Sequence, residues 1–130
     1  LDNLDNLNVL SAQNDLSTFY KNASIVTNLS LNDRFVETFG MTLIEGMTYS
    51  TPVIAPNYGG PKEIVKNEKC GYLVDSFDVE VVADKINSLL SNYELYKSFS
   101  KEAFKRSTLF SFEEYSKDIR QIVNEAFYEN

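Results

Sequence analysis

The strongest constraint on the fold of this chain is a set of three short, mainly apolar segments. They are separated by stretches that can form helices. Residues 23–27, 52–55 and 71–74 are mainly apolar, and each is short enough to be a buried strand. Residues 41–49 lie between the first two segments, with Leu43, Ile44 and Met47 on one side of a predicted helix. Residues 62–66 lie between the last two and allow one helical turn. Strands joined through a helix pair in parallel, because the chain must cross the sheet before the next strand begins. The sequence therefore predicts an α/β fold with a Rossmann-like parallel sheet and flanking helices.

The chain on either side of these segments predicts further elements. Residues 8–10 are expected to form a short strand and residues 14–20 a short helix. After the last strand, helical periodicity continues through residues 78–90, 93–106 and 112–127, and a capping box at Ser111 and Glu114 introduces the final helix. We expect this helical third to pack over the sheet. Three or four strands are few for a doubly wound domain, so the chain is expected to be the later part of a larger one.

Composition removes several classes of function. The chain of 130 residues is expected to be a single domain, and it has no His and one Cys. It therefore cannot supply a disulfide framework, a cysteine or histidine zinc site, or a Ser–His or Cys–His catalytic pair. The formal net charge is −7 and the basic residues form no cluster, which disfavours nucleic acid as a partner. No apolar run approaches the roughly 20 residues of a membrane span and no signal peptide opens the sequence, so we expect a soluble, intracellular protein.

Two acidic residues, Glu37 and Glu45, flank a glycine and the start of the predicted helix over residues 41–49. The free N–H groups of a helix N-terminus attract anions, and carboxylates accept hydrogen bonds from hydroxyls. Each acid also has a simpler interpretation, since Thr42 and Glu45 match a capping box and Glu37 could be a solvated loop acid. Because Gly40 permits a close backbone approach, the spacing favours a contact with phosphate or nucleotide.

Residues 37–47 resemble the Glu-x7-Glu signature of family 4 glycosyltransferases, which are retaining enzymes with two facing Rossmann-like domains (the GT-B fold). The similarity continues in order through residues 50–55, 59–65 and 71–74 and the terminal helices. It implies the donor-nucleotide-binding C-terminal domain of such an enzyme, truncated at its N-terminal side. The chain departs from the family in having Thr38 where Gly is usual. Its loop over residues 28–36 is longer, and it lacks the residue that often stands between the second glycine and the proline of residues 59–61.

The resemblance also implies roles for individual residues. Glu37 is expected to be the catalytic residue that contacts hydroxyls of the donor sugar, and Glu45 to bind the ribose of the donor nucleotide. The segment between them is expected to line the donor sugar and diphosphate, through Thr38, Phe39, Gly40, Met41 and Thr42. The donor would be a nucleotide sugar such as a UDP- or GDP-sugar, with no cofactor and no essential metal. By composition, Gly59 and Gly60 predict a tight turn outside the ligand site.

For the whole protein, the resemblance implies transfer of a sugar, with retention, to a glycan, a lipid-linked acceptor or a small molecule. The acceptor-binding N-terminal domain and the basic residues that neutralise the diphosphate are absent from this chain, so the isolated piece is expected to be inactive. The whole protein is expected in the cytoplasm, and peripheral association with the inner face of the membrane is a second option. Two alternatives are a non-catalytic nucleotide-sugar-binding or interaction module and a nucleotide-sugar epimerase. The absence of His and the four ordered sequence blocks disfavour the epimerase.

Overall fold

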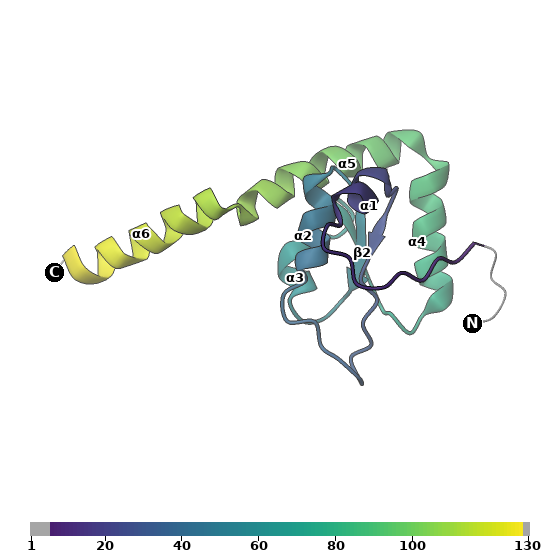
Figure 1. Ribbon diagram of the computed structural model, residues 1–130, viewed down its shortest axis with the longest axis horizontal. Helices are drawn as coiled ribbons and strands as arrows, with labels where there is room; N and C mark the ends of the chain where they lie inside the picture. Colours follow the sequence, from purple (N-terminus) through teal and green to yellow (C-terminus); the bar gives the residue numbers. More distant parts are fainter. Residues whose placement is uncertain (1–5, 129–130) are drawn as a thin grey trace.

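A three-stranded parallel sheet lies at the centre of the computed structural model, which describes residues 6–128 (Figure 1). The strands are β1 (Val26–Thr27), β2 (Val53–Pro56) and β3 (Gly71–Val74), in the order β1-β2-β3. In register, Val53 of β2 pairs with Val26 on one side and Gly71 on the other. All residues of β2 are buried, as expected of a central parallel strand covered on both faces.

Helices follow or precede each strand in the order the sequence predicts. They are α1 (Ser17–Asn22), α2 (Met41–Thr48), α3 (Pro61–Ile64), α4 (Val79–Ser91), α5 (Tyr93–Ser107), the 3-10 turn η1 (Thr108–Phe110) and α6 (Phe112–Tyr128). The observed bounds of β3, α2, α4 and α5 lie within one or two residues of the predicted segments. The predicted α/β class, with a parallel sheet and a helical C-terminus, is therefore confirmed.

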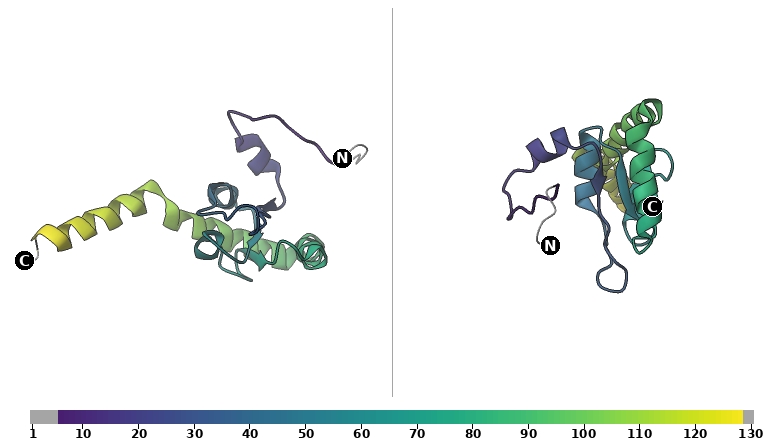
Figure 2. Two further views of the ribbon diagram at one scale, coloured as in Figure 1. Left: turned by 90° about the horizontal axis from the view of Figure 1, so that it is seen from below. Right: turned by 90° about the vertical axis from the view of Figure 1, so that its right-hand side faces the viewer.

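Two apolar clusters cover the two faces of the sheet. On one face, α2 and α3 pack on the strands, through buried side chains that include Leu43, Met47, Val53, Ala55 and Ile64. On the other face, α4 packs on β2 and β3 through Ile54, Tyr72, Val74, Val82 and Leu89. Figure 2 shows α2 and α4 on opposite sides of the sheet. Helix α5 joins the clusters, because its Ala103 belongs to the first and its Phe99 to the second.

The N-terminal part of the chain differs from the prediction. Residues 8–10 form no strand, because they do not pair with β1, and the side chains of Val9 and Leu10 are exposed. The strand predicted over residues 23–27 is paired only at Val26 and Thr27. Helix α1 begins at Ser17, three residues later than predicted, where Asp15 accepts a hydrogen bond from the Ser17 amide at 2.8 Å.

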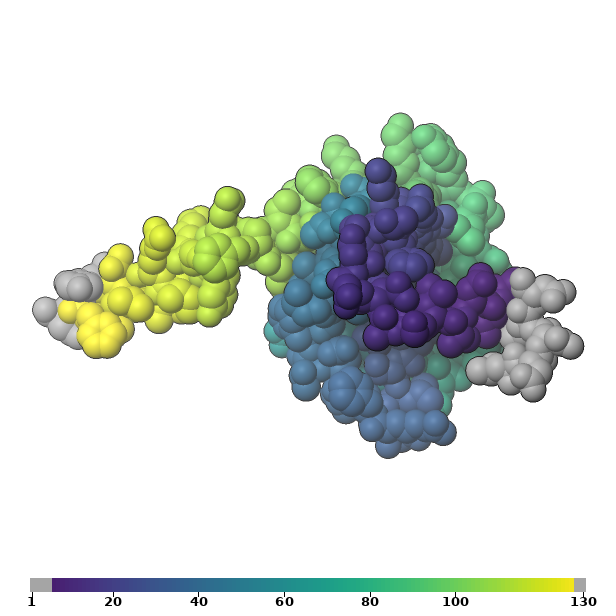
Figure 3. Space-filling model, in the orientation of Figure 1, coloured from purple at the N-terminus to yellow at the C-terminus, as the bar shows by residue number. Residues whose placement is uncertain are grey.

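The last helix also departs from the prediction that the helical third packs over the sheet. Helices α4 and α5 do so, but α6 adjoins η1 and then stands clear of the body (Figures 1 and 3). Its apolar side is exposed, at Phe112, Tyr115, Ile119, Ile122, Val123 and Phe127. The expectation was wrong because an apolar stripe predicts a helix with one apolar face and does not specify what that face contacts.

Only half of the predicted capping box at the start of α6 forms. The Ser111 hydroxyl accepts a hydrogen bond from the Glu114 amide at 3.3 Å. The Ser111 amide instead donates to the carbonyl of Thr108, and the Glu114 carboxylate lies 3.5 Å from the Lys117 ammonium. The η1 turn thus supplies the acceptor that the Glu114 side chain would have supplied.

Candidate functional site

The first acid of the predicted site lies in the loop that follows β1, at the carboxyl edge of the sheet. The Asn28 amide continues the sheet by donating to the Ile54 carbonyl at 3.0 Å. The Asn28 side-chain nitrogen then donates to Oε2 of Glu37 at 3.0 Å, and the Phe39 amide donates to Oε1 at 3.2 Å. Each oxygen of this half-buried carboxylate therefore accepts a hydrogen bond, so the protein orients Glu37 within its loop.

The turn after β2 packs directly against this loop. The Gly60 amide donates to the Glu37 carbonyl at 2.9 Å, and the Tyr58 hydroxyl donates to the Ser30 carbonyl. A Cβ on Gly60 would lie 2.2 Å from the Thr38 carbonyl oxygen, and one on Gly59 would lie 2.3 Å from that of Glu37. Gly59 also has φ +64°, a left-handed conformation that favours glycine. The two glycines form the predicted tight turn, and they also support the loop that carries Glu37.

Helix α2 starts at the same edge with a glycine as its N-cap. Gly40 has φ 99° and offers no side-chain cap, and the Leu43 amide donates to its carbonyl at 3.0 Å. Within residues 6–128, the amides of Met41 and Thr42 have no hydrogen-bond acceptor. The predicted capping box of Thr42 and Glu45 does not form, because Thr42 is already the second residue of the helix. Two backbone donors at a helix N-terminus are thus free to bind an anion.

The second acid, Glu45, lies one turn further along α2 and faces α1. Its Oε2 accepts a hydrogen bond from the Tyr20 hydroxyl at 2.7 Å. The Tyr20 ring stacks on that of Tyr49, with ring centroids 6.1 Å apart and planes 21° apart. Burial, together with the hydrogen bond to the Glu45 carboxylate and its charge, raises the pKa of Tyr20 to about 12. The Tyr20 phenol is therefore protonated at neutral pH and acts as a hydrogen-bond donor to Glu45.

A groove of about 500 Å³ runs beside Glu45 between the N-terminal segment and α2. Its walls come from residues 13–17, from Tyr20 and from the outer side of α2 and Tyr49. Glu37 is not among the groove residues, so the two acids lie at different parts of the predicted site. The sequence analysis missed Tyr20 as a site residue, since its helical spacing indicated only a packed aromatic.

The remaining predicted site residues lie between the two acids. Thr38 and Phe39 are exposed in the loop before α2, and the Phe39 ring meets Phe110 edge-on with centroids 6.4 Å apart. Met41 is exposed and lines the groove beside Glu45. In chain order, the two free amides thus lie between the two carboxylates, which offers hydrogen-bond acceptors for hydroxyls and donors for phosphate.

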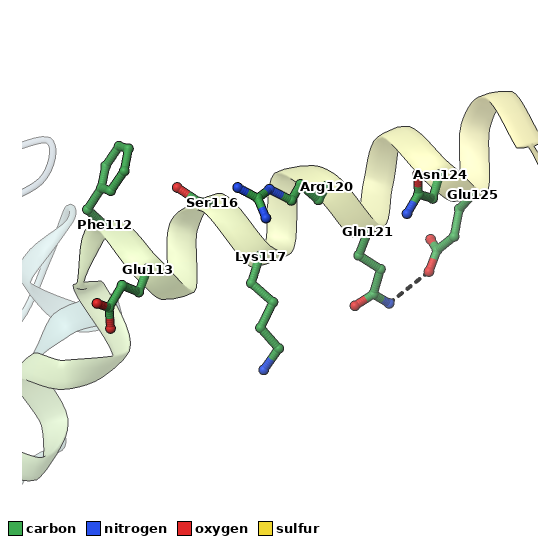
Figure 4. Close-up of a pocket in the computed structure, with 8 residues that line it drawn as sticks. All are labelled: Phe112, Glu113, Ser116, Lys117, Arg120, Gln121, Asn124 and Glu125. Carbon is green, nitrogen blue, oxygen red and sulfur yellow. Dashed lines mark hydrogen bonds between the residues drawn. The ribbon is translucent and has the colours of Figure 1, made fainter.

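A larger hollow, of about 740 Å³, follows one side of α6 and does not form a binding site of this kind. All of its lining side chains come from that single helix (Figure 4). The contact between them is a hydrogen bond from Gln121 to Glu125 at 2.8 Å, shown in the same view. Within residues 6–128, no second element lines this hollow, which is the solvated polar side of a projecting helix.

Two absences within residues 6–128 bear on function. They contain no cluster of three His, Cys, Asp or Glu side chains placed to hold a metal ion. None of their helices is both long enough and apolar enough to cross a bilayer. Cys70 is buried directly before β3, and burial raises the pKa of its thiol.

Comparison with known proteins decides the family. The sequence model described as "Glycosyl transferases group 1" matches residues 1–106. The chain belongs to this family. The match contains both acids, the glycine turn and the helices through most of α5, and it ends before α6.

Similar proteins of the group 1 family agree with this assignment. A probable sucrose-phosphate synthase of Vicia faba is 34% identical over 105 residues, which are 81% of this chain and 10% of that protein. Among solved structures, the sucrose-phosphate synthase of Thermosynechococcus elongatus has a TM-score of 0.74 and 28% identity, covering 88% of this chain and 28% of that one. A glycosyltransferase of Rickettsia africae ESF-5 has a TM-score of 0.79 and 27% identity, covering 91% and 31%.

These alignments also set the scale of the chain. It spans about a tenth of the length of the curated relatives that it matches. The solved neighbours are GT-B glycosyltransferases, so the resemblance to a C-terminal domain of that fold is confirmed.

Proposed function

We propose that this chain is the donor-binding part of a retaining glycosyltransferase that uses a nucleotide diphosphate sugar. Membership of the group 1 family supports the class of reaction. The observation that carries the proposal is the N-terminus of α2, where the free amides of Met41 and Thr42 lie between the carboxylates of Glu37 and Glu45. Free helix amides suit a diphosphate and the carboxylates suit the hydroxyls of two sugars, which is the chemistry of a nucleotide sugar.

In this proposal, Glu37 accepts hydrogen bonds from hydroxyls of the transferred sugar near the bond that breaks. Its two hydrogen bonds, from Asn28 and from the Phe39 amide, fix the carboxylate before the donor binds. Backbone groups from Thr38 to Thr42 line the sugar and the diphosphate. Negative charge grows on the diphosphate as it departs, and the helix amides stabilise that charge more in the transition state than in the bound donor.

Glu45 is proposed to accept hydrogen bonds from the ribose of the donor nucleotide, which would lie in the groove beside α2. The donor would be a UDP- or GDP-sugar, and transfer would need no essential metal. We further propose that a facing N-terminal domain binds a glycan, lipid-linked or small-molecule acceptor, and that the whole protein works in the cytoplasm. The alignment with about a tenth of the curated relatives supports the presence of further domains in such enzymes.

The test is a calorimetric titration of the full-length protein with a panel of UDP- and GDP-sugars, together with turnover measurements. We expect Glu45→Ala to weaken nucleotide binding by about tenfold or more, because a group that binds hydroxyls is removed. Glu37→Ala should mainly lower the turnover number. Glu113→Ala, at an exposed position on α6, is the matched control and should change neither. Absence of nucleotide-sugar binding would overturn the proposal, and binding without transfer would favour the non-catalytic module.

A further inference from the structure

The side chain of Glu45 has a single hydrogen-bond partner among the described residues, the hydroxyl of Tyr20. That bond, at 2.7 Å, joins Oε2 to a residue 25 positions earlier in the chain. Within residues 6–128, no Lys or Arg forms an ion pair with Glu45, and Oε1 accepts no hydrogen bond. One carboxylate oxygen is therefore fixed by the protein and the other is available.

Tyr20 is itself held in place by its ring and by its backbone. Its ring stacks on Tyr49, which directly follows α2 and is therefore part of the same rigid helix end as Glu45. Its backbone lies in α1, which packs on α2. A phenol whose ring is stacked and whose hydroxyl is bonded has little rotational freedom, so it restrains the three rotatable bonds of the glutamate side chain.

We propose that Tyr20 is a positioning residue for Glu45, which it orients so that the free carboxylate oxygen accepts hydrogen bonds from the ribose hydroxyls of the donor. This inference rests on the proposed function, because it assumes that a nucleotide occupies the groove beside Glu45. The two contacts are compatible, since an ionised carboxylate has about four lone-pair sites and Tyr20 uses one of them. At neutral pH the phenol is protonated, and it therefore donates to Glu45 without competing for the ribose hydroxyl protons.

The direct prediction concerns discrimination between sugars, beyond a general loss of affinity. A carboxylate that is held in place favours a ribose over a sugar lacking the hydroxyl that it binds. A carboxylate that is free to rotate spends part of its time away from the ribose and loses that preference. Removing the Tyr20 hydroxyl should therefore weaken binding of the ribonucleotide and leave binding of the deoxy analogue nearly unchanged.

The experiment measures the dissociation constants of UDP or GDP, whichever base the donor carries, and of its 2′-deoxy and 3′-deoxy analogues on the full-length protein. We expect the preference for the ribonucleotide to fall about three- to tenfold in Tyr20→Phe, the range set by one net hydrogen bond. Tyr115→Phe is the matched control, because it removes an exposed tyrosine hydroxyl on α6, outside the groove, that makes no hydrogen bond within the described residues. It should keep the wild-type preference.

Further measurements distinguish failure of the Tyr20 role from failure of the Glu45 role or of the proposed function. If Tyr20 acts through Glu45, Tyr20→Phe should have no further effect on the preference in a Glu45→Gln background, because coupled residues are not additive. A wild-type preference that survives in Tyr20→Phe, with native circular dichroism, would overturn the positioning role alone. A wild-type protein that binds the nucleotide without any preference would instead contradict the ribose role of Glu45, and absence of binding would overturn the proposed function.

Discussion

The Gly60 amide donates a hydrogen bond to the Glu37 carbonyl at 2.9 Å, which fixes the loop carrying the first acid to the turn after β2. The loop follows one strand and the turn follows the next, and the two strands are parallel neighbours. Ligands of open α/β sheets bind at the carboxyl ends of such strands. The contact therefore joins the loop after β1 to the turn after β2. It fixes the position of Glu37 and of the start of α2 at this edge of the sheet.

Substitution of Gly60 should disturb this surface. In Gly60→Ala the new Cβ would lie 2.2 Å from the Thr38 carbonyl oxygen and 2.4 Å from its carbon, so the backbone must shift. We expect a loss of about 1–3 kcal/mol in the free energy of unfolding, the usual range for overpacking, and a clear fall in donor turnover. Denaturant unfolding and turnover of the purified variant measure the two effects.

Gly46→Ala is the matched control, because it should lower stability without disturbing the loop that carries Glu37. Its Cβ would lie 2.8 Å from a methyl of Val26, in the core between α2 and β1. We expect a comparable loss of stability with little change in the turnover of the folded protein. Wild-type turnover in Gly60→Ala would show that the turn does not position the loop.

The contact between Tyr20 and Glu45 should make the stability of the fold depend on pH in the alkaline range. The pKa of Tyr20 is raised from 10.0 in the unfolded chain to about 12 in the folded one, by burial and by the Glu45 carboxylate. A raised pKa stabilises the fold below the unfolded value, so this contribution is complete below pH 10 and is lost between pH 10 and about 12. Titration of tyrosinate absorbance should show a late step that disappears in Tyr20→Phe.

Glu45→Gln should move that step to lower pH without restoring the ordinary value. The variant removes the charged acceptor, while burial, the larger cause, remains. A late step that persists in Tyr20→Phe would belong to another residue. Tyr96, whose pKa is also raised by burial, would then be the first to examine.

The sequence predicted those features that depend on neighbouring residues and missed those that depend on distant ones. Residues 71–74 become β3 and residues 41–48 become α2 because their apolar spacing and flanking glycines act locally. The composition of residues 57–61 predicted a turn, but its packing against Thr38 joins segments from two different crossovers. Tyr20 meets Glu45 across 25 residues, and no local pattern identifies such a contact.

The bond from Asn28 to Glu37 predicts that a single change of charge will impair the site. In Asn28→Asp, the nitrogen that donates to Glu37 at 3.0 Å becomes a carboxylate oxygen, while the oxygen that accepts from the Ser30 amide and hydroxyl is retained. The local loop should therefore fold as before, with a like charge against Glu37. We expect turnover to fall by about ten- to a hundredfold, because misplacing a reacting group is costly.

Asn32→Asp is the matched control for that variant, since it adds the same charge at an exposed position of the same loop. It should leave turnover within about twofold of the wild type, as expected of an exposed charge screened by salt. Donor affinity and turnover should be measured at the same ionic strength for both variants. Equal losses in the two would assign the effect to net charge near the site and not to the bond between Asn28 and Glu37.

The exposure of α6 predicts that this helix contributes little to the stability of the folded body. Its apolar side chains are exposed, with Phe112 at 82% and Phe127 at 77%, so α6 adds little to the stability of the body. Deleting residues 112–130 should lower the free energy of unfolding by less than about 1 kcal/mol, whereas Leu89→Ala in the core should cost about 2–5 kcal/mol. Thermal unfolding of the two variants measures this difference, and a large loss on deletion would show that α6 packs against the body in solution.

The same exposed face should make the chain associate, because an apolar patch of this kind is unfavourable in water. Ile119→Lys places a charge in its centre, and Asn124→Lys places the same charge on the polar side seen in Figure 4. We expect sedimentation velocity to show less association for Ile119→Lys and no change for Asn124→Lys. If both variants behaved alike, net charge would govern association, and the apolar face of α6 would have no part in it.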